Sequence, residues 1–273
     1  MLVLITIVGL TIGLSLISRT VTDIRISSQI EQSGRAFSAA EAGVENALKG
    51  AIVGNQQSTV RLPDANGTYT TGTYSVSSIG NTNTLSFPVT SHTETQTIWL
   101  ADHKNDGTLN EASGKDPTGF TFDLCWGTDT NNNAAIALSL FYKDTDGYKF
   151  ARSAYDKNGT SRNPVANNFD NVVESGPNNY CDGNYQYRKT ISPLGDFKLD
   201  ALKNPKLLFL RIMPVYENTT FAIKANANLP VQGKIITSVG QTTTGVVRKI
   251  QVTQGYNVLP TLLDFTLFAE TKQ

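Results

Sequence analysis

Hydrophobic positions in the first fifty residues follow two successive patterns. Residues 1–17, MLVLITIVGLTIGLSLI, carry no charge, and the first basic residue is Arg19. Beyond them, apolar or small residues recur three or four positions apart with one slip, at Ile17, Val21, Ile24, Ser28, Ile30, Gly34, Phe37, Ala40, Val44, Leu48 and Ala51. This spacing is the period of an α-helix with one apolar side. No proline occurs before Pro63, so we predict one helix over residues 1–53, apolar all round in 1–17 and amphipathic in 18–53.

Downstream of residue 54 the hydrophobic period changes to two, which predicts β-strands separated by Asn- and Gly-rich turns. Single strands are expected at 72–78, 83–91, 95–102, 119–127, 187–193, 233–241, 245–254 and 262–270, and hairpins at 134–156 and 206–225. The first hairpin turns at Asp146-Gly147, a pair that favours tight turns. No second strong helix is predicted, so the fold class is α+β.

The predicted helix has a consequence for what the chain contacts. Fifty residues of α-helix are about 75 Å long, and its first third is apolar on every side. A helix of that form cannot bury its first third within its own small domain. We therefore expect residues 1–17 to lie in lipid or against identical helices of other subunits, although seventeen residues rise only about 25 Å and are short for a bilayer span.

Composition favours a location outside the cell and gives no sign of a nucleic-acid partner. Charged residues make up 17% of the chain, and 23 basic residues balance 23 acidic ones. A chain without net charge has no long-range field to attract nucleic acid, so no specific nucleic-acid partner is predicted. Abundant Thr, Asn, Ser and Gly are typical of a secreted β protein.

The two cysteines agree with an oxidising location. Cys125 lies in a predicted strand and Cys181 in a predicted loop, and one even pair outside the cell usually forms a disulfide. The alternative is two buried free thiols. Three Asn-x-Thr sequons, at Asn66, Asn158 and Asn218, are possible glycosylation sites in a surface protein, although an Asn/Thr-rich chain produces them by chance.

Catalytic and metal-binding patterns are weak in this sequence. Its only histidines, His92 and His103, belong to no catalytic motif and are expected at the surface; no phosphate-binding loop is present. Asp144 and Asp146 resemble the start of a calcium loop without its distal Glu, so a hairpin turn is favoured. No enzyme activity, cofactor or metal is predicted. Aromatic residues alternate along the predicted strands, which favours packing in the core and between strands, with a sugar-binding surface as the alternative. These residues are Trp99, Trp126, Phe141, Tyr142, Tyr148, Phe150 and Tyr155.

Residues 36–48, AFSAAEAGVENAL, follow the charge-free segment and carry a family resemblance. Together the two segments resemble the amino-terminal helix of type IV pilins and pseudopilins, especially the PilX-like subgroup with its AAEAG(I/V)E signature. The resemblance covers about fifty residues. It implies that a prepilin peptidase removes a leader, that the helix holds the subunit in the inner membrane, and that helices form a central bundle in the filament. The missing leader fits a mature chain beginning at Met1.

One departure from the family concerns the start of the helix. Most pilins carry a Glu five residues into the mature chain, and this chain has Ile5, with no acid before Asp23. The family's pairing between that Glu and a neighbouring terminal amine is therefore absent if Met1 is the mature first residue. Two interpretations therefore remain: the chain is a minor subunit, or it is a divergent major pilin that relies on helix packing.

The resemblance also implies a domain organisation. Pilins usually pack an antiparallel sheet on the exposed half of the long helix, and residues 233–256 resemble the last paired strands of that sheet. We expect residues 54–94 and 230–273 to form this pilin-like sheet domain. Residues 95–229 are then an inserted β-sandwich, for which a jelly roll is one candidate.

Two functions follow from the resemblance. The first is a structural subunit of an extracellular type IV pilus-like filament, inserted in the cytoplasmic membrane before assembly. Its partners are copies of itself, minor pilins and the inner-membrane assembly machinery. Assembly would use the apolar residues Met1, Leu2, Val3, Leu4, Ile5, Ile7, Val8, Leu10, Ile12, Leu14, Leu16, Ile17, Val21 and Ile24. The alternative is a minor pilin or membrane-anchored adhesin whose β-sandwich binds glycan, surface or DNA. A membrane-anchored hydrolase is disfavoured by the lack of clustered His and acidic residues.

Overall fold

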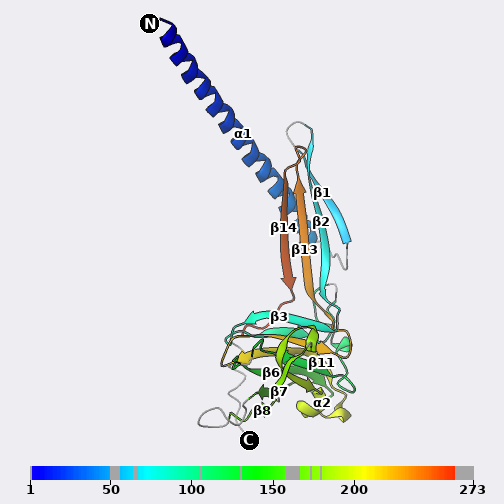
Figure 1. Cartoon of the computed structure of the whole chain (residues 1–273). Helices are drawn as coiled ribbons and strands as arrows, with labels where there is room; N and C mark the ends of the chain where they lie inside the picture. Colours follow the sequence, from blue (N-terminus) through cyan, green and yellow to red (C-terminus); the bar gives the residue numbers. More distant parts are fainter. Residues whose placement is uncertain are drawn as a thin grey trace. The chain divides into compact units, whose positions relative to one another are not determined.

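The computed structural model describes residues 2–49, 56–63, 67–104, 106–129, 131–157, 167–172, 174–178 and 180–261. One long helix, α1 (Leu2–Lys49), begins the chain, and nearly all other regular structure is β-strand (Figure 1). The single helix predicted over residues 1–53 is confirmed from Leu2 to Lys49, and residues 1 and 50–53 lie outside the described residues. The fold class is α+β. The one other α-helix among the described residues is the short α2 (Pro193–Asp196).

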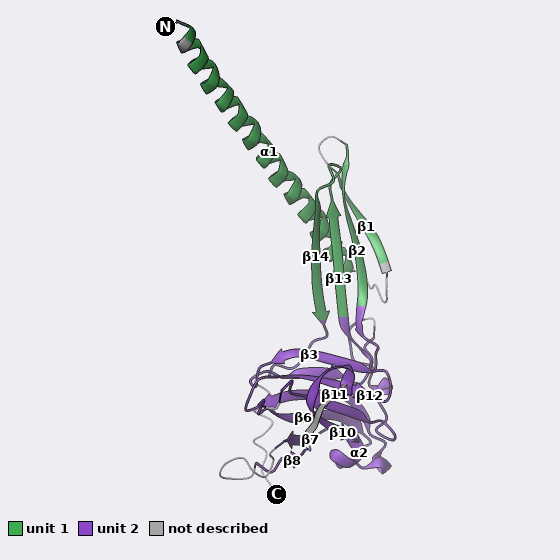
Figure 2. Cartoon of the chain, viewed as in Figure 1, with its two compact units in different colours: residues 1–77, 234–254 green, residues 78–233, 255–273 purple. Residues whose placement is uncertain are grey.

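The chain divides into two compact units (Figure 2). Unit 1 comprises residues 1–77 and 234–254, and unit 2 comprises residues 78–233 and 255–273. We expected the divisions near residues 94 and 230. The first expectation is wrong because strand β3 (Thr84–Thr90) pairs with β12 (Thr219–Ala225) of unit 2. Residues 255–273, which we assigned to the pilin-like sheet, also belong to unit 2.

Unit 1 packs the second half of α1 on a four-stranded sheet. The strand order is β1 (Gln56–Pro63), β2 (Tyr69–Gly80), β13 (Val231–Gln241) and β14 (Val247–Gly255). β13 and β14 match the strands predicted at 233–241 and 245–254. The strand predicted at 262–270 lies outside the described residues, and no pattern had predicted β1. Alternate residues of β2 are buried from Thr70 to Val76, as expected for a sheet with one covered face.

Small side chains form the face of α1 that contacts this sheet. The buried residues of that face lie three or four positions apart: Ala36, Ala39, Ala40, Gly43 and Ala47. Opposite them, a Cβ on Gly72 would lie 2.1 Å from the Ala39 carbonyl oxygen, and one on Gly240 would lie 1.8 Å from the Ala36 carbonyl oxygen. Because no real Cβ fits at such distances, helix backbone and strand backbone are in direct contact.

The close contact changes which side of the helix is buried. Phe37 and Leu48 belong to the predicted apolar stripe, yet both are exposed, while Ala36 and Ala47 outside that stripe are fully buried. A large side chain cannot enter a space that two glycines and the alanines already fill. Near the end of α1, Ala47 joins Tyr74, Val76 and Ile236 in a small apolar cluster.

Unit 2 is a sandwich of two five-stranded sheets. One sheet has the order β3, β12, β5 (Phe122–Trp126), β10 (Tyr185–Ile191) and β9 (Glu174–Asn178). The other has the order β4 (Gln96–Trp99), β11 (Lys206–Val215), β6 (Ala135–Asp144), β7 (Gly147–Asp156) and β8 (Asp170–Asn171).

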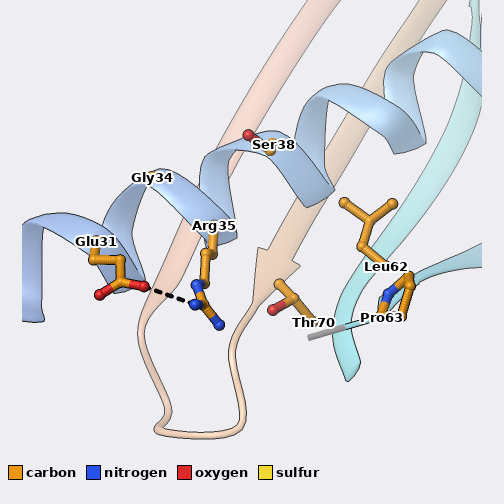
Figure 3. Close-up of a pocket in the computed structure, with 7 residues that line it drawn as sticks. All are labelled: Glu31, Gly34, Arg35, Ser38, Leu62, Pro63 and Thr70. Atoms are coloured by element: carbon orange, nitrogen blue, oxygen red, sulfur yellow. Dashed lines mark hydrogen bonds and ion pairs between the residues drawn. The ribbon is translucent and has the colours of Figure 1, made fainter. Parts of the chain in front are cut away.

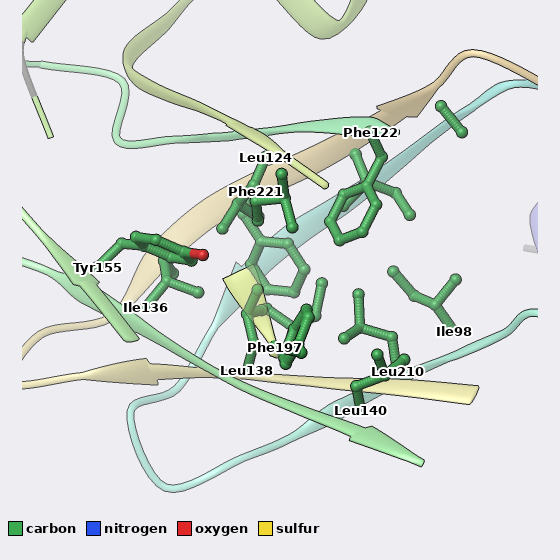
Figure 4. Packing of buried hydrophobic residues seen from close by; sticks show 14 of the residues in the cluster. Ile98, Phe122, Leu124, Ile136, Leu138, Leu140, Tyr155, Phe197, Leu210 and Phe221 are labelled. Carbon is green, nitrogen blue, oxygen red and sulfur yellow. The ribbon is translucent and has the colours of Figure 1, made fainter. Parts of the chain in front are cut away.

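The core of unit 2 lies between these sheets (Figure 4). Both sheets contribute fully buried side chains to one cluster, among them Leu124 and Phe221 from the first sheet and Leu138, Leu140 and Leu210 from the second. Trp126 is also fully buried, and its indole nitrogen donates to the Ala134 carbonyl at 3.0 Å. A cluster shared in this way makes unit 2 a β-sandwich, as expected for the inserted part of the chain.

One predicted hairpin is present and the other is not. β6 and β7 pair in continuous register as the predicted hairpin, but the turn lies at Thr145-Asp146, one residue before the predicted Asp146-Gly147. β11 and β12, predicted as a hairpin over 206–225, lie in different sheets: β11 pairs with β4 and β6, and β12 pairs with β3 and β5. Both edges of each strand are already occupied, so the chain crosses between the sheets at Tyr216, whose φ is +75°.

Candidate functional site: the amino-terminal helix

The first part of α1 presents apolar side chains without cover. Val3, Leu10 and Ile24 are 72%, 66% and 63% exposed. Exposed large apolar residues continue along the helix at Ile7, Val8, Ile12, Leu14, Leu16, Ile17, Val21, Ile26 and Ile30. For Leu2, Leu4 and Ile5 only the backbone is described, and Met1 lies outside the described residues. An apolar surface of this extent marks a membrane or protein contact.

The threonine hydroxyls in the first half of α1 are hydrogen-bonded inside the helix. Thr6 and Thr11 donate their hydroxyls to the carbonyls of Val3 and Val8 at 2.9 and 2.8 Å. Thr20 and Thr22 donate to Leu16 and Ser18 at 3.0 and 2.9 Å. Hydroxyls bonded in this way lose little when water is removed. The segment is therefore suited to lipid or to a helix bundle.

By length and composition, α1 is long and apolar enough to cross a membrane. The candidate stretch is Thr6–Lys49, and no residue of its apolar window is buried within the chain. A helix that formed the core of its own domain would be mostly buried. This amino-terminal position and composition are compatible with a membrane anchor or a signal sequence.

Unit 1 also contains a shallow pocket beside the packed half of α1 (Figure 3). It has a volume of about 400 Å³ and is lined by Glu31, Gly34, Arg35, Ser38, Leu62, Pro63 and Thr70. Its charged groups are already paired, with Arg35 Nη2 2.6 Å from Glu31 Oε1. This lining combines one ion pair with small and apolar side chains, and it presents no general base beside a nucleophile.

The two histidines are separated in the structure and have different surroundings. Asn218 Oδ1 accepts hydrogen bonds from the backbone N–H and from the Nδ1 of the exposed His92, at 3.0 and 2.9 Å. His103, which we expected at the surface, is half-buried and stacks on Tyr256 with 3.5 Å between ring centroids. Burial lowers the pKa of His103, and the nearby Asp102 charge opposes that shift. Within the described part of the chain, no three His, Cys, Asp or Glu side chains gather in a way that could hold a metal ion.

The carboxylates of the β6–β7 hairpin are paired with lysines. Lys149 Nζ lies 2.9 Å from both Asp144 Oδ2 and Asp146 Oδ2, and Lys203 Nζ lies 2.6 Å from Asp146 Oδ2. Hydrogen bonds from Lys203 and then Lys149 lower the pKa of Asp146 to about 2. Two ammonium groups already neutralise the oxygens that a calcium ion would need, which favours the turn interpretation.

The predicted aromatic residues divide between the core and the outer face of one sheet. Trp126 and Tyr155 are fully buried in the core, and Tyr142 packs against it. On the outer face, Trp99, Phe209, Phe141 and Phe150 form a row in register across β4, β11, β6 and β7. Phe141 and Phe209 stack face to face, with 4.5 Å between centroids. Because those ring faces cover each other, the row is built for cross-strand packing rather than for stacking on a sugar.

The predicted disulfide between Cys125 and Cys181 is present. The two Cα atoms lie 6.3 Å apart, and the bond closes a sequence separation of 56 residues. It lies in a small buried cluster with Tyr185 and Ala222. Of the three sequons, Asn66 and Asn158 lie outside the described residues, and the Asn218 side chain accepts the hydrogen bonds from His92.

Comparisons with known proteins do not assign the chain to a family. No protein-family model matches it, and no curated protein matches it either. Among solved structures, an exo-beta-agarase has 11% identity and a TM-score of 0.16, and the match covers 66% of this chain and 23% of the agarase chain. Clostridium perfringens delta-toxin has 9% identity and a TM-score of 0.08, with 73% and 87% covered. This chain therefore spans about a quarter of the agarase chain, and superpositions this poor establish no shared fold.

Proposed function

We propose that this chain is a non-enzymatic structural subunit of an extracellular type IV pilus-like filament that polymerises through α1. The observation that carries the proposal is the row of exposed apolar side chains between Val3 and Ile30, on a helix whose threonine hydroxyls are hydrogen-bonded internally. Before assembly this surface lies in the cytoplasmic membrane. In the filament it packs against the same surface of other copies, and the β-rich units are exposed on the fibre.

The energetic basis is the summed burial of many side chains. Burying one Leu, Ile or Val side chain stabilises by about 1.5–3 kcal/mol relative to water. Each copy contacts several neighbours in a helical fibre, so individually weak helix contacts add along it. Copies of itself are therefore the principal partner, with minor pilins and the inner-membrane assembly machinery as further partners.

The half of α1 that packs on the four-stranded sheet of unit 1 supports a pilin-like arrangement. The stretch that resembles pilins, AFSAAEAGVENAL, supplies Ala36, Ala39, Ala40, Gly43 and Ala47 to the sheet contact. The sheet is antiparallel where β1 meets β2, and its other strands come from the carboxyl end of the chain. One helix thus carries an assembly surface in its first half and a domain anchor in its second.

The strand order of unit 2 supports a jelly roll as the form of its sandwich. With β3, β4, β5, β6, β7, β10, β11 and β12 counted as strands one to eight, the sheets have the orders 1-8-3-6 and 2-7-4-5. Jelly rolls have eight such strands in two sheets joined by Greek-key connections. Lectin domains share that architecture, and for this reason a minor pilin or anchored adhesin is the second candidate function.

Assembly of the purified full-length chain tests the first proposal. We expect detergent removal to produce filaments that electron microscopy resolves as repeats of this chain, as in appendages sheared from the producing cells. Leu10→Asp and Leu14→Asp place a charge in the exposed apolar surface and should abolish filaments. Leu202 is 95% exposed in unit 2, so Leu202→Asp is the matched control and should assemble normally.

Two results would decide against the filament. Recovery of the chain only as a monomer in the membrane fraction would contradict a major subunit. Specific binding of the full-length chain to a glycan array, without filaments from the same preparation, would favour the adhesin.

A further inference from the structure

The charged residues of α1 differ in whether they have partners within the chain. In the second half, Arg35 pairs with Glu31 at 2.6 Å and Lys49 pairs with Glu45 at 2.5 Å. Both pairs have the acid four residues before the base, which is the favourable order on a helix.

Three charges nearer the apolar end have no such pairing. The side chains of Arg19, Asp23 and Arg25 make no hydrogen bond or ion pair to any other described residue. Arg19 and Asp23 are four residues apart but have the base first, which is the less favourable order. The three charges lie among exposed apolar side chains, with Val21, Ile24 and Ile26 at 43%, 63% and 50% exposure.

This combination becomes costly when the helix surface is buried. A charge that leaves water without a partner carries a large desolvation penalty, whereas an opposite charge at contact distance offsets much of it. The chain itself supplies no partner among the described residues. Any assembly that buries Val21, Ile24 and Ile26 must therefore bring an opposite charge from another molecule.

We propose that Arg19, Asp23 and Arg25 pair with the same residues of neighbouring copies and thereby set the axial register of the helices. This inference rests on the proposed filament function. For parallel identical helices, Arg19 of one copy is level with Asp23 of the next when the copies are offset by four residues, or about 6 Å. Arg25 lies about 3 Å beyond Asp23 along the axis and contacts the same carboxylate from a further neighbour. The charges on one helix thus face opposite charges on an identical helix that is shifted along the fibre axis.

Charge reversal in the full-length chain tests this register. We expect Arg19→Asp alone and Asp23→Arg alone each to lower filament yield at least tenfold after detergent removal. An equimolar mixture of these two variants should give a higher yield than either alone, because residue 19 of each copy then meets an opposite charge at residue 23 of the other. The contact from Arg25 returns only at the copies that keep Asp23. Rescue in the mixture cannot arise from a contact within one chain. Lys104 is exposed in unit 2, and Lys104→Asp serves as the control that should assemble like the wild type.

The outcomes distinguish a failure of the proposed charge pairing from a failure of the filament function on which it rests. Wild-type filaments with unchanged yield in either single variant would overturn the register and leave the filament intact. If Asp23→Arg assembles normally and only Arg19→Asp fails, the arginine acts on anionic lipid headgroups instead, and the register is again overturned. Single variants that fail and a mixture that also fails would overturn it too, whereas the absence of wild-type filaments would overturn the filament function itself. Retention of the Cys125–Cys181 disulfide and of an unchanged circular dichroism spectrum identifies variants that are folded.

Discussion

Gly240 in β13 contacts Ala36 in α1 so closely that a Cβ on the glycine would lie 1.8 Å from the alanine carbonyl oxygen. Gly72 in β2 has the same relationship to Ala39, at 2.1 Å. The two contacts hold one side of the helix directly on the sheet. Large side chains such as Phe37 are consequently left on the outer side.

Replacing either glycine should therefore detach the helix from its sheet. We expect Gly240→Ala to destabilise unit 1 by more than about 3 kcal/mol, because neither backbone can move away easily. Hydrogen exchange monitored by mass spectrometry should show lost protection in residues 34–47 and in β13, with unit 2 unchanged. Gly255 has open space around it, so Gly255→Ala should leave protection as it is. Wild-type protection in Gly240→Ala would show that the contact is looser than the structure indicates.

Removal of the disulfide should destabilise unit 2. A closed loop of 56 residues corresponds to about 4 kcal/mol in the chain-entropy model. We expect the Cys125→Ala/Cys181→Ala variant to lose about that much unfolding free energy, measured by urea denaturation of the full chain in detergent. Exchange protection in unit 1 should stay the same. A loss below about 1 kcal/mol would contradict the expectation.

Acid should weaken unit 2 through His103. Burial lowers the pKa of this histidine in the folded chain, whereas an unfolded histidine titrates near pH 6.5. The unfolded state therefore binds the proton first, and stability is complete above about pH 6.5 and falls as the pH drops below it. Thermal unfolding between pH 7.5 and 5 should show a falling midpoint. His103→Phe keeps the stack on Tyr256 and should remove most of that decrease, whereas His92→Gln should retain it.

Calcium should not stabilise the β6–β7 hairpin. Lys149 and Lys203 already neutralise Asp144 and Asp146, and the pKa of Asp146 falls to about 2. We expect the same melting temperature in millimolar calcium and in EDTA. A calcium-dependent increase that disappears in Asp146→Asn would show that the metal displaces the lysines.

Local patterns in the sequence were sufficient for several features. The helical period and the absence of proline predicted α1, and alternation around Asp146-Gly147 predicted the β6–β7 hairpin. The even pair of cysteines predicted the bond between Cys125 and Cys181. Each of these depends on residues close in sequence or on a simple count.

Long-range pairing was beyond those patterns. Strand β3 was assigned to the wrong unit, and 206–225 was predicted as a hairpin, because period-two alternation shows that a strand has a buried face and not which strand it joins. The row from Trp99 to Phe150 was visible only as scattered aromatic residues until the register placed them side by side.

The sequence by itself determined that this protein has a long helix with an apolar, charge-free beginning, because helix period and hydropathy are local properties. Only the tertiary structure decided which side of that helix is buried. Gly72 and Gly240 lie far from Ala36 and Ala39 in sequence, and the space between two backbones in contact admits small side chains alone. Phe37 and Leu48, which the helical pattern placed on the apolar side, were thereby left on the surface.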